Sequence, residues 1–316
     1  MKLTRFLFLL SMGIVLVSCK NDDDGVEVIP PRLLSEVTVE DDAEILDYLR
    51  THFYNYEEFA SPPAGFDFKI KLDTIAGVNA GKTPLIDQVS SSTVLRSSDH
   101  FLLSAGEEDI PHTFYYLEAR EGSGMSPTVA DSSFVRFQGS LLDGEVFDGS
   151  TTTAVWFDLA RLQAPAQGAR GFSEAIPNFK AGGQVIDNGD GTFMVEDYGV
   201  GIMFLPSGLG FFNAFQPSIP QYSPLIFTID LFTINATDHD RDGIPSIMED
   251  LDGDGYLYND NTDEEEEQLL FVNFLDSDDD GDGTPTREEI IIDDQGNITF
   301  PDTDGDGTPD YLDSDS

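Results

Sequence analysis

Basic residues are scarce in this chain of 316 residues: 16 Lys and Arg stand against 60 Asp and Glu, and the formal net charge is −44. Phosphate backbones and anionic membrane surfaces repel such a chain, so no nucleic acid is expected as a partner. The four histidines are scattered without the spacing of a metal site. Hydrophobic residues make up 40% of the chain, which is enough for a folded core.

Cysteine is almost absent, and the single Cys19 follows an N-terminal segment typical of exported proteins. Lys2 and Arg5 precede an apolar stretch, residues 6–17, which is too short to span the roughly 30 Å of a bilayer as a permanent helix. The Leu-Val-Ser-Cys sequence that ends at Cys19 resembles the lipobox of bacterial lipoproteins. This resemblance implies cleavage after residue 18 and a lipid on the Cys19 sulfur. The alternative is an ordinary secretory signal with a coincidental cysteine.

The residues after Cys19 indicate where such a lipoprotein would go. Residues 20–24 (Lys-Asn-Asp-Asp-Asp) resemble the surface-export signal of Bacteroidetes lipoproteins. The expected location is therefore the outer membrane, with the protein on its periplasmic or outer face and the membrane contacted through the lipid. Residues 19–36 are charged and then proline-bearing, which is typical of a flexible tether.

Composition divides the chain into five segments. After the signal peptide (1–18) and the tether (19–36), we expect a small α/β region of unassigned role (37–111), a β-rich domain (112–236) and an acidic tail (237–316). In the α/β region, apolar residues at steps of three and four predict a helix that begins near Thr38 and continues to Tyr56. Alternation from Phe66 to Leu72 predicts a strand, and the Ser-rich residues 90–98 predict a loop.

The β-rich domain consists of short apolar segments separated by Gly, Asp and Pro, with one short helix predicted around residues 172–180. This pattern predicts an α+β fold dominated by antiparallel sheet. Residues 134–150 (FVRFQGSLLDGEVFDGS) resemble the FKBP-type peptidyl-prolyl isomerases, in which a strand ending in Tyr-x-Gly precedes Leu-x-Asp-Gly-x-x-Phe-Asp-Ser. Weaker matches follow in the family's order, so the resemblance covers roughly residues 112–234. It implies an FKBP-like antiparallel sheet wrapped on a short helix.

The activity implied by this resemblance needs no acid, base or catalytic cofactor. Rotation about an X-Pro bond faces a barrier near 20 kcal/mol because resonance keeps the amide planar. An apolar aromatic pocket favours the twisted, less polar amide over the planar one. By resemblance, the pocket would be formed by Phe137, Phe147, Val155, Phe172, Ile219 and Phe227, with Asp148 at its rim and Phe211 beside the substrate. The expected partners are proline-containing exported polypeptides.

Several substitutions separate the chain from the family pattern. Phe137 replaces a Tyr and Phe172 replaces a Trp, and both keep the apolar area. Phe211 replaces a Tyr that donates a hydrogen bond to the substrate, and losing that bond costs about 0.5–1.5 kcal/mol. Phe212 stands where a Gly is expected, and an extra segment, residues 184–200, lengthens a hairpin. The alternatives are that these aromatic residues are simply the core of a β-rich domain, or that a degenerate domain binds a protein partner without catalysis.

The acidic tail contains 28 of the 60 acidic residues and repeats a calcium-loop pattern. Residues 238–249 and 278–289 fit D-x-D-x-D-G-x5-E, residues 302–313 end on Asp instead, and residues 250–255 open a loop without a clear final carboxylate. Positions 1, 3 and 5 direct carboxylates to one point, Gly at 6 permits the sharp turn, and position 12 closes the shell that Ca²⁺ prefers. The predicted ligands are Asp238, Asp240, Asp242, Glu249, Asp250, Asp252, Asp254, Asp278, Asp280, Asp282, Glu289, Asp302, Asp304, Asp306 and Asp313.

Three prolines argue against paired EF-hands. Pro245, Pro285 and Pro309 occupy loop position 8, where paired EF-hands use a backbone N–H that proline lacks. The tail resembles thrombospondin type 3 repeats instead, which implies structural calcium whose removal loosens the segment. The alternative is a disordered acidic tail. The sequence as a whole predicts a lipid-anchored isomerase of the cell envelope, or else a non-enzymatic envelope or surface lipoprotein.

Overall fold

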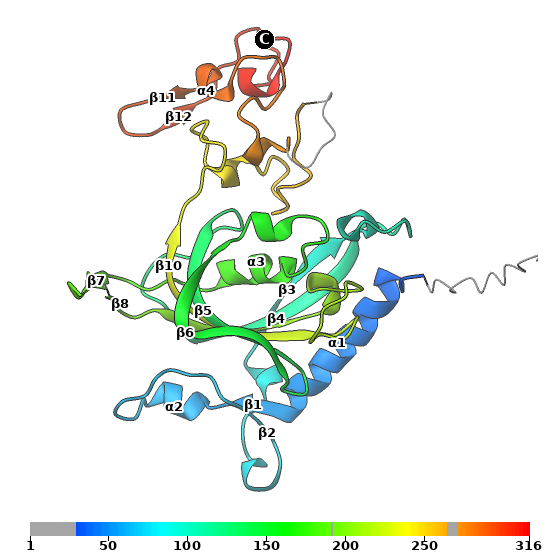
Figure 1. The fold of residues 1–316 in the computed structure, drawn as a ribbon, viewed down its shortest axis with the longest axis vertical. Coiled ribbons are helices and arrows are strands. Elements are labelled where there is room, and N and C mark those ends of the chain that lie inside the picture. The colour runs from blue at the N-terminus through cyan, green and yellow to red at the C-terminus, as the bar shows by residue number, and fades with distance from the viewer. Residues whose placement is uncertain (1–29, 191, 264–270) are drawn as a thin grey trace, which may run out of the picture. The chain divides into compact units, whose positions relative to one another are not determined.

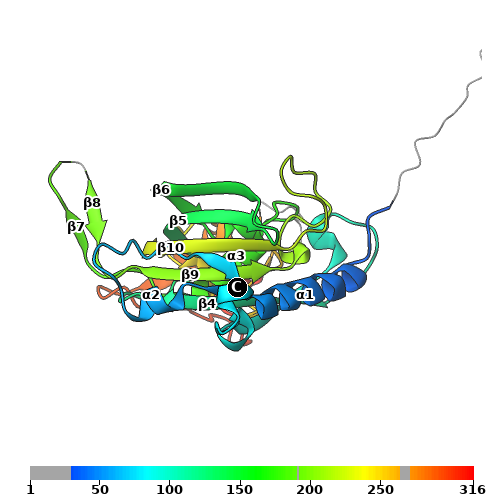
Figure 2. The same ribbon diagram turned by 90° about the horizontal axis from the view of Figure 1, so that it is seen from below.

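A six-stranded antiparallel sheet organises the chain (Figures 1 and 2). The computed structural model describes residues 30–190, 192–263 and 271–316, so the signal peptide, Cys19, most of the tether and four consecutive glutamates of the acidic tail (264–267) lie outside the described residues. In spatial order the strands are β3 (Ser90–Arg96), β4 (Ile110–Arg120), β9 (Gly199–Leu205), β10 (Leu225–Asn235), β5 (Ser132–Leu141) and β6 (Val146–Asp158). Every neighbouring pair is antiparallel. The predicted α+β class with antiparallel sheet is therefore confirmed.

The central strand β9 is buried along its whole length because both faces of the sheet are covered. Its odd-numbered residues Met203 and Leu205 pack with Phe172 of the short helix α3 (Arg170–Ala175). The alternate residues Ile202 and Phe204 pack on the other face with the long helix α1 (Leu34–Thr51). The sequence of a strand between two apolar layers is apolar at successive positions and does not alternate with polar residues.

The predicted short helix is present, and a 3₁₀ turn (Ile176–Asn178) extends it. The predicted long helix differs at both ends. It begins at Leu34 rather than near Thr38, and it ends at Thr51 rather than at Tyr56. His52–Tyr54 forms strand β1, which pairs with β2 (Leu72–Thr74), and helix α2 (Tyr56–Ala60) follows. The spacing of apolar residues at three and four positions therefore continues beyond the end of the helix. The helix ends earlier because the next residues form β1 and pair with β2.

The strand predicted from Phe66 to Leu72 forms only at its last residue. Phe68 has a φ of 55°, which is incompatible with extended backbone. The ring of Phe66 instead lies 5.2 Å from that of Phe59 and 5.0 Å from that of Phe68. Local aromatic packing thus replaces the strand.

The loop predicted for residues 90–98 is wrong, because β3 occupies most of that segment. Its residues pair with β4 from Ser90 opposite Tyr116 to Arg96 opposite Ile110. The strand lies at the edge of the sheet and is mostly exposed, so its serines need no apolar alternation. The α/β region therefore contributes a strand to the main sheet. Arg32–Ser316 cluster as one unit, and the expected boundaries at 112 and 237 remain predictions.

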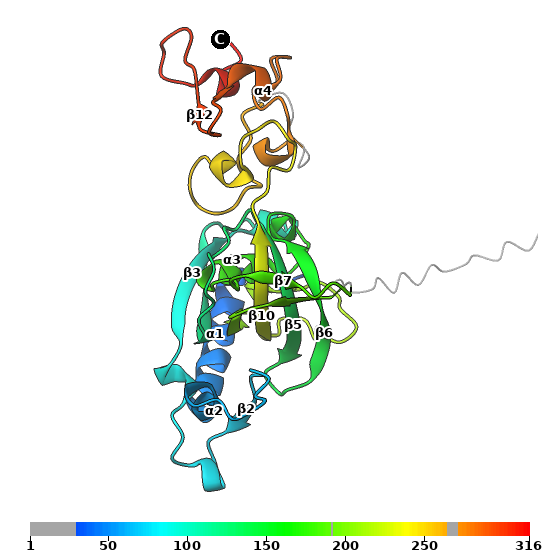
Figure 3. The same cartoon turned by 90° about the vertical axis from the view of Figure 1, so that its left-hand side faces the viewer.

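The chain leaves the sheet through β10 and enters the acidic tail (Figure 3). There the elements are short: helix α4 (Thr286–Glu289), strands β11 (Ile291–Ile292) and β12 (Ile298–Thr299), and 3₁₀ turns at 246–249, 273–275 and 310–312. The extra segment forms the hairpin of β7 (Val185–Asp187) and β8 (Phe193–Val195), which projects from the sheet in Figure 1. Among the described residues, no helix has the length and apolarity required to cross a membrane.

Candidate functional site

Four phenylalanine rings from four elements meet on the α3 face of the sheet. Phe172 of α3 lies 6.3 Å from Phe137 of β5 and 5.5 Å from Phe227 of β10, measured between ring centroids. Phe147 of β6 lies 5.6 Å from Phe227. These separations are favourable for aromatic pairs. The structure therefore brings together the main aromatic residues predicted for the proline pocket, and we call them the phenylalanine cluster.

A glycine makes the close approach of two rings possible. A Cβ atom on Gly139 would lie 2.5 Å from ring atoms of Phe147 and 2.9 Å from the ring of Phe227. Phe137, two residues earlier on β5, has its side chain on the same face because side chains alternate along a strand. The Phe-x-Gly sequence thus provides one ring and the space for a second.

Burial differs across the predicted pocket residues. Phe137, Phe172, Ile219 and Phe227 are buried, whereas Phe147, Val155 and Phe211 pack against them and remain partly exposed. Asp148 is exposed, and its carboxylate accepts the backbone N–H of Gly149 at 2.7 Å. A buried aromatic floor with a partly exposed wall and a polar edge is an arrangement that can hold an apolar proline ring.

Phe157 belongs to this group although the motif comparison missed it. Its ring lies 5.0 Å from that of Phe172 and 5.2 Å from that of Phe137. The signal was present in the sequence, because Phe157 follows Val155 at the spacing of one strand face. Beside Ile219, a cavity of about 470 Å³ is lined by Glu145 and residues 215–221.

The two residues that depart from the family pattern have different surroundings. The ring of Phe211 lies against Gly168, where a Cβ atom would come within 2.3 Å of it. Phe212 is buried in a separate cluster with Leu34 and Val37 of α1. Its φ of 45° is unusual for a bulky residue. Phe212 therefore anchors the N-terminal helix and lies outside the phenylalanine cluster.

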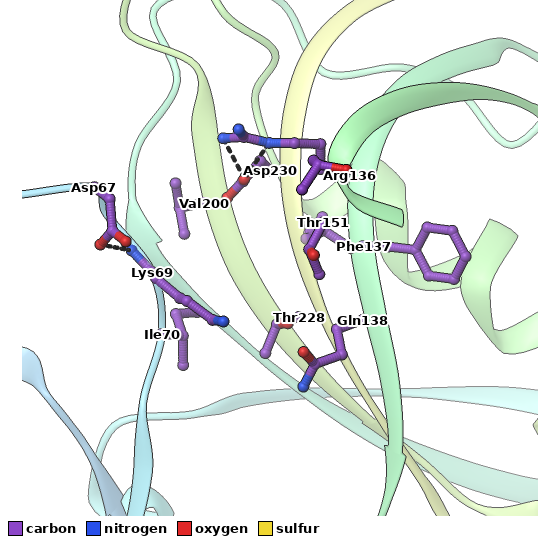
Figure 4. Close-up of a pocket in the computed structure, with 12 residues that line it drawn as sticks. Asp67, Lys69, Ile70, Arg136, Phe137, Gln138, Thr151, Val200, Thr228 and Asp230 are labelled. Atoms are coloured by element: carbon purple, nitrogen blue, oxygen red, sulfur yellow. Dashed lines mark hydrogen bonds and ion pairs between the residues drawn. The ribbon is translucent and has the colours of Figure 1, made fainter. Parts of the chain in front are cut away.

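A second cavity, of about 310 Å³, lies on the opposite side of β5 (Figure 4). Arg136 and Asp230 form an ion pair of 2.7 Å there, and the ring of Phe137 points away from both. Burial raises the pKa of Asp230, although the Arg136 guanidinium opposes that shift. The sequence did not predict this cavity.

The four loops of the acidic tail share one backbone conformation. Gly at position 6 has a positive φ in each, from 81° at Gly255 to 106° at Gly243 and Gly307. The position-5 aspartate of every loop accepts the backbone N–H of position 7 at 2.5–2.7 Å. In the loops that begin at Asp250, Asp278 and Asp302, the position-1 aspartate also accepts the glycine N–H.

The prolines at position 8 fit this conformation. Each precedes a short helical turn that leads to the end of the loop, as Pro245 does for residues 246–249. The side chain at position 9 accepts the backbone N–H of position 2, for example Thr286 from Asp279 at 3.1 Å and Asp310 from Thr303 at 2.7 Å. A repeated set of bonds of this kind indicates an ordered unit rather than a random acidic tail.

Carboxylate oxygens converge in each loop. The oxygens of positions 1, 3 and 5 lie within 4.8 Å of one another in all four loops. Glu289, the predicted closing residue of the third loop, has a buried oxygen without a hydrogen-bond partner, and burial and its aspartate neighbours raise its pKa to about 7. Asp313 instead accepts the backbone N–H of Asp315 at 3.2 Å.

One convergence joins two loops. Glu249 closes the first loop, and its carboxylate lies within 4.8 Å of those of Asp240 and of Asp279 from the third loop. Glu249 and Asp279 are each 1% exposed, and none of their four carboxylate oxygens has a hydrogen-bond partner among the described residues. Burial, followed by the neighbouring carboxylates, raises the pKa of Glu249 to about 10 and that of Asp279 to about 9. Buried carboxylates without hydrogen-bond partners are suited to bind a cation.

The loop pattern missed two acidic residues. Asp279 stands at position 2, which supplies no ligand within its own loop. Its place among the converging carboxylates is apparent only from the packing of the third loop against the first. Asp260 precedes the last position of the second loop and is 5% exposed with one unpartnered oxygen. Burial raises its pKa to about 7, and its other oxygen accepts the backbone N–H of Leu251. The charges of Asp250 and Asp252 add to this rise, which places a late carboxylate near the second loop.

Comparisons with known proteins match two different parts of the chain. A family model described as BamM C-terminal matches residues 239–300, within the acidic tail. The FKBP-type peptidyl-prolyl cis-trans isomerase FkpA of Escherichia coli K12 is 27% identical to this chain over 119 residues, and FkpA of E. coli O157:H7 matches equally. The match covers 38% of this chain and 37% of the length of these relatives. The chain thus has an FKBP-type isomerase relative over part of its length.

Among solved structures, FkpA of E. coli is 20% identical to this chain with a TM-score of 0.31, over 63% of this chain and 62% of that one. A peptidyl-prolyl cis-trans isomerase of Pseudomonas syringae is 23% identical with a TM-score of 0.30, over 39% of this chain and 75% of that one. The three FKBP domains of wheat FKBP73 give 16% identity and a TM-score of 0.29, over 40% and 46% of the chains.

Proposed function

We propose that the chain is an FKBP-type peptidyl-prolyl isomerase that assists the folding of exported proteins. The observation that carries this proposal is the phenylalanine cluster, in which Phe137, Phe147, Phe172 and Phe227 meet beside a polar edge. The 27% identity to an FKBP-type isomerase supports it independently.

Catalysis in this site would come from burial of the substrate. A proline ring placed against Phe172 is surrounded by aromatic surface, which disfavours the planar amide with its larger dipole and better hydration. The exposed carboxylate of Asp148 stands at the edge of this surface and can orient the peptide. No proton transfer or metal is required, because the bond that changes is rotated and not broken.

The alternative is a binding module without catalysis, and one observation favours it. Phe211 has no hydroxyl to donate to the substrate carbonyl, and its ring packs against Gly168. The missing bond lowers the rate by up to about tenfold and leaves the apolar surface intact. We therefore favour the weakened enzyme over the inactive module.

Calcium would stabilise the tail rather than take part in catalysis. The buried, unpartnered carboxylates of Glu249 and Asp279 support cation binding, as do the converging aspartates of the four loops. Ca²⁺ prefers hard oxygen ligands in such numbers and would offset the repulsion between them. The match of residues 239–300 to a family model supports a recurring structural unit. Resemblance to thrombospondin type 3 repeats remains our interpretation of the sequence.

The location proposed is the outer membrane, through a lipid on Cys19, with the protein on its periplasmic or outer face. The supporting observations are the lipobox-like sequence before Cys19 and the acidic residues after it. Replacing Cys19 with Ala should leave the precursor uncleaved or release the protein from the membrane fraction. A variant that is still processed and membrane-bound would overturn the anchor.

The isomerase proposal is tested by a proline-isomerisation assay on the chain from residue 20 onward, with calcium present. The expected result is a rate of cis–trans exchange above the uncatalysed rate, proportional to protein concentration. An exchange rate equal to the background would favour the binding module.

A further inference from the structure

Two buried arginines line a cavity of about 210 Å³ that none of the sequence patterns predicted. Arg96 lies at the end of β3 and Arg170 begins α3, and each is only 4% exposed. The chain has 16 basic residues in all, so two buried side by side in a protein of net charge −44 require an explanation. The cavity also contacts Phe211, which packs against the apolar core that includes the phenylalanine cluster.

The hydrogen-bonding groups of these arginines are only partly satisfied by the surrounding residues. Arg170 donates from Nε to Glu174 at 2.8 Å, but its Nη1 has no partner. Arg96 forms no ion pair within the described residues, and its Nε and Nη1 lack hydrogen-bond partners. The negative charge of Asp99 also affects the pKa of Arg96, but Asp99 is exposed and forms no ion pair with it among the described residues. Burial and the charge of Arg170 lower the pKa of Arg96 to about 9, which is the expected response to an unpaired buried cation.

Aromatic stacking holds both guanidinium groups in place. Arg96 lies 4.7 Å above the ring of Phe101, and Arg170 lies 4.0 Å above the ring of Tyr256 from the acidic tail. His100, which also lines the cavity, accepts the backbone N–H of Ser97. Burial and the two arginines lower its pKa to about 3, so it stays neutral. Glu174 is the one carboxylate that forms an ion pair with these arginines among the described residues, and the exposed Asp99 and Asp254 act on them without forming ion pairs. In the part of the chain that the structure describes, three guanidinium nitrogens therefore remain without a hydrogen-bond partner.

We propose that this cavity binds one carboxylate group of a polypeptide, supplied by an acidic residue close to the proline. This inference rests on the isomerase function proposed above and adds a substrate preference to it. A guanidinium presents its N–H groups as a planar fork that matches the two oxygens of a carboxylate. The volume is below that of pockets for drug-sized ligands, roughly 300–1,000 Å³, but suits a short acidic side chain. Phe211 lines the cavity and packs against the apolar core that includes the phenylalanine cluster, so one peptide can reach both.

The test uses the chain from residue 20 onward and pairs of fluorescent proline peptides that differ only by Glu or Gln at each of three positions on either side of the proline. We expect one Glu peptide to bind about tenfold more tightly than its Gln partner, which is the worth of a charge-assisted hydrogen bond. A third set, with the carboxylate supplied only by a free C-terminus, distinguishes a chain end from a side chain. Equal affinities for the Glu, Gln and C-terminal peptides would overturn the proposal.

Substitutions separate a ligand-binding arginine from a structural one. Arg96→Met keeps the stacked alkyl chain and should abolish the Glu preference while leaving the melting temperature unchanged or higher, because an unpaired buried charge is removed. Arg96→Lys keeps the charge without the fork and should retain only part of the preference. The control is Arg50→Met on the exposed surface of α1, which should change neither property. A lower melting temperature for Arg96→Met with the Glu preference unchanged would contradict the proposal.

The outcomes also separate this inference from the isomerase function. Isomerase activity without a Glu preference would refute the carboxylate site and leave the enzyme. A Glu preference that Arg96→Met removes, in a protein without isomerase activity, would support the cavity as a peptide site and refute the enzyme.

Discussion

At the scale of single residues, Phe211 separates a weakened enzyme from an inactive domain. Its ring packs on Gly168 and against the apolar core that includes the phenylalanine cluster, so the position is occupied by an aromatic ring that lacks only the hydroxyl. Phe211→Tyr should restore a donor and raise kcat/KM for a proline peptide by up to about tenfold, the worth of one hydrogen bond. Steady-state kinetics checks this. A variant with unchanged kcat/KM would mean that the substrate carbonyl does not reach this position.

Asp41 of α1 links the N-terminal helix to the loop that carries Phe211. Its carboxylate is 2% exposed and accepts both the backbone N–H and the hydroxyl of Ser207, at 2.7 and 2.6 Å. Burial raises its pKa from 3.8 to about 6, so folding favours the protonated form. The stability it contributes is complete below pH 3.8 and is lost as the pH rises through 6.

Asp41→Asn mimics the protonated form and should therefore stabilise the protein at pH 8 and have little effect at pH 4. A pKa shift of about two units corresponds to about 3 kcal/mol, which is the upper limit of the gain in the free energy of unfolding. Denaturant unfolding at both pH values measures it, with Asp47→Asn on the exposed side of α1 as the control. Equal destabilisation at both pH values would show that the ionised carboxylate is required.

At the scale of elements, the acidic loops depend on contacts between loops as well as within them. Asp279→Asn should weaken calcium binding at the first loop by at least about tenfold, because one of the three carboxylates that meet near Glu249 loses its charge. Calorimetry on the chain from residue 20 onward measures the affinity and the number of ions. Glu288→Gln changes an exposed neighbour in the same loop and should have no effect. Identical isotherms for Asp279→Asn and the wild type would refute the shared ligand.

The sequence predicted the elements that are defined by local residue spacing. It missed those that are defined by contacts with residues distant in the chain. The loop glycines and the short helix of α3 follow local spacing, and both are present. Strand β3 was missed because an exposed edge strand needs no apolar pattern; only its pairing with β4 defines it. Asp279 and the two arginines were missed for the same reason, since each acquires its role from residues distant in the chain.

At the scale of the whole molecule, the acidic tail and the β-rich part of the chain share contacts. The His239 ring lies 3.1 Å from the Asp158 carboxylate, the backbone N–H of Leu257 donates to Gln163, and Arg170 stacks on Tyr256. Calcium that binds only the folded tail stabilises it by about 2.7 kcal/mol per site at a concentration of 100 Kd. Chelation should therefore lower the melting temperature. It should also weaken the binding of acidic peptides at the cavity lined by Arg96 and Arg170. Calorimetric melts with calcium, with magnesium and with a chelator test this, and equal melting temperatures would refute it.

The central claim is that the phenylalanine cluster is an isomerase site, and one comparison tests it most directly. Proline-isomerase kcat/KM is measured for the wild type, for Phe147→Ala, and for Phe193→Ala, which removes a half-exposed ring of the β7–β8 hairpin outside the cluster. Phe147→Ala should lose nearly all activity because water enters beside Phe227, while Phe193→Ala should keep the wild-type value. Equal activity in the wild type and Phe147→Ala, or background activity in all three proteins, would contradict the account.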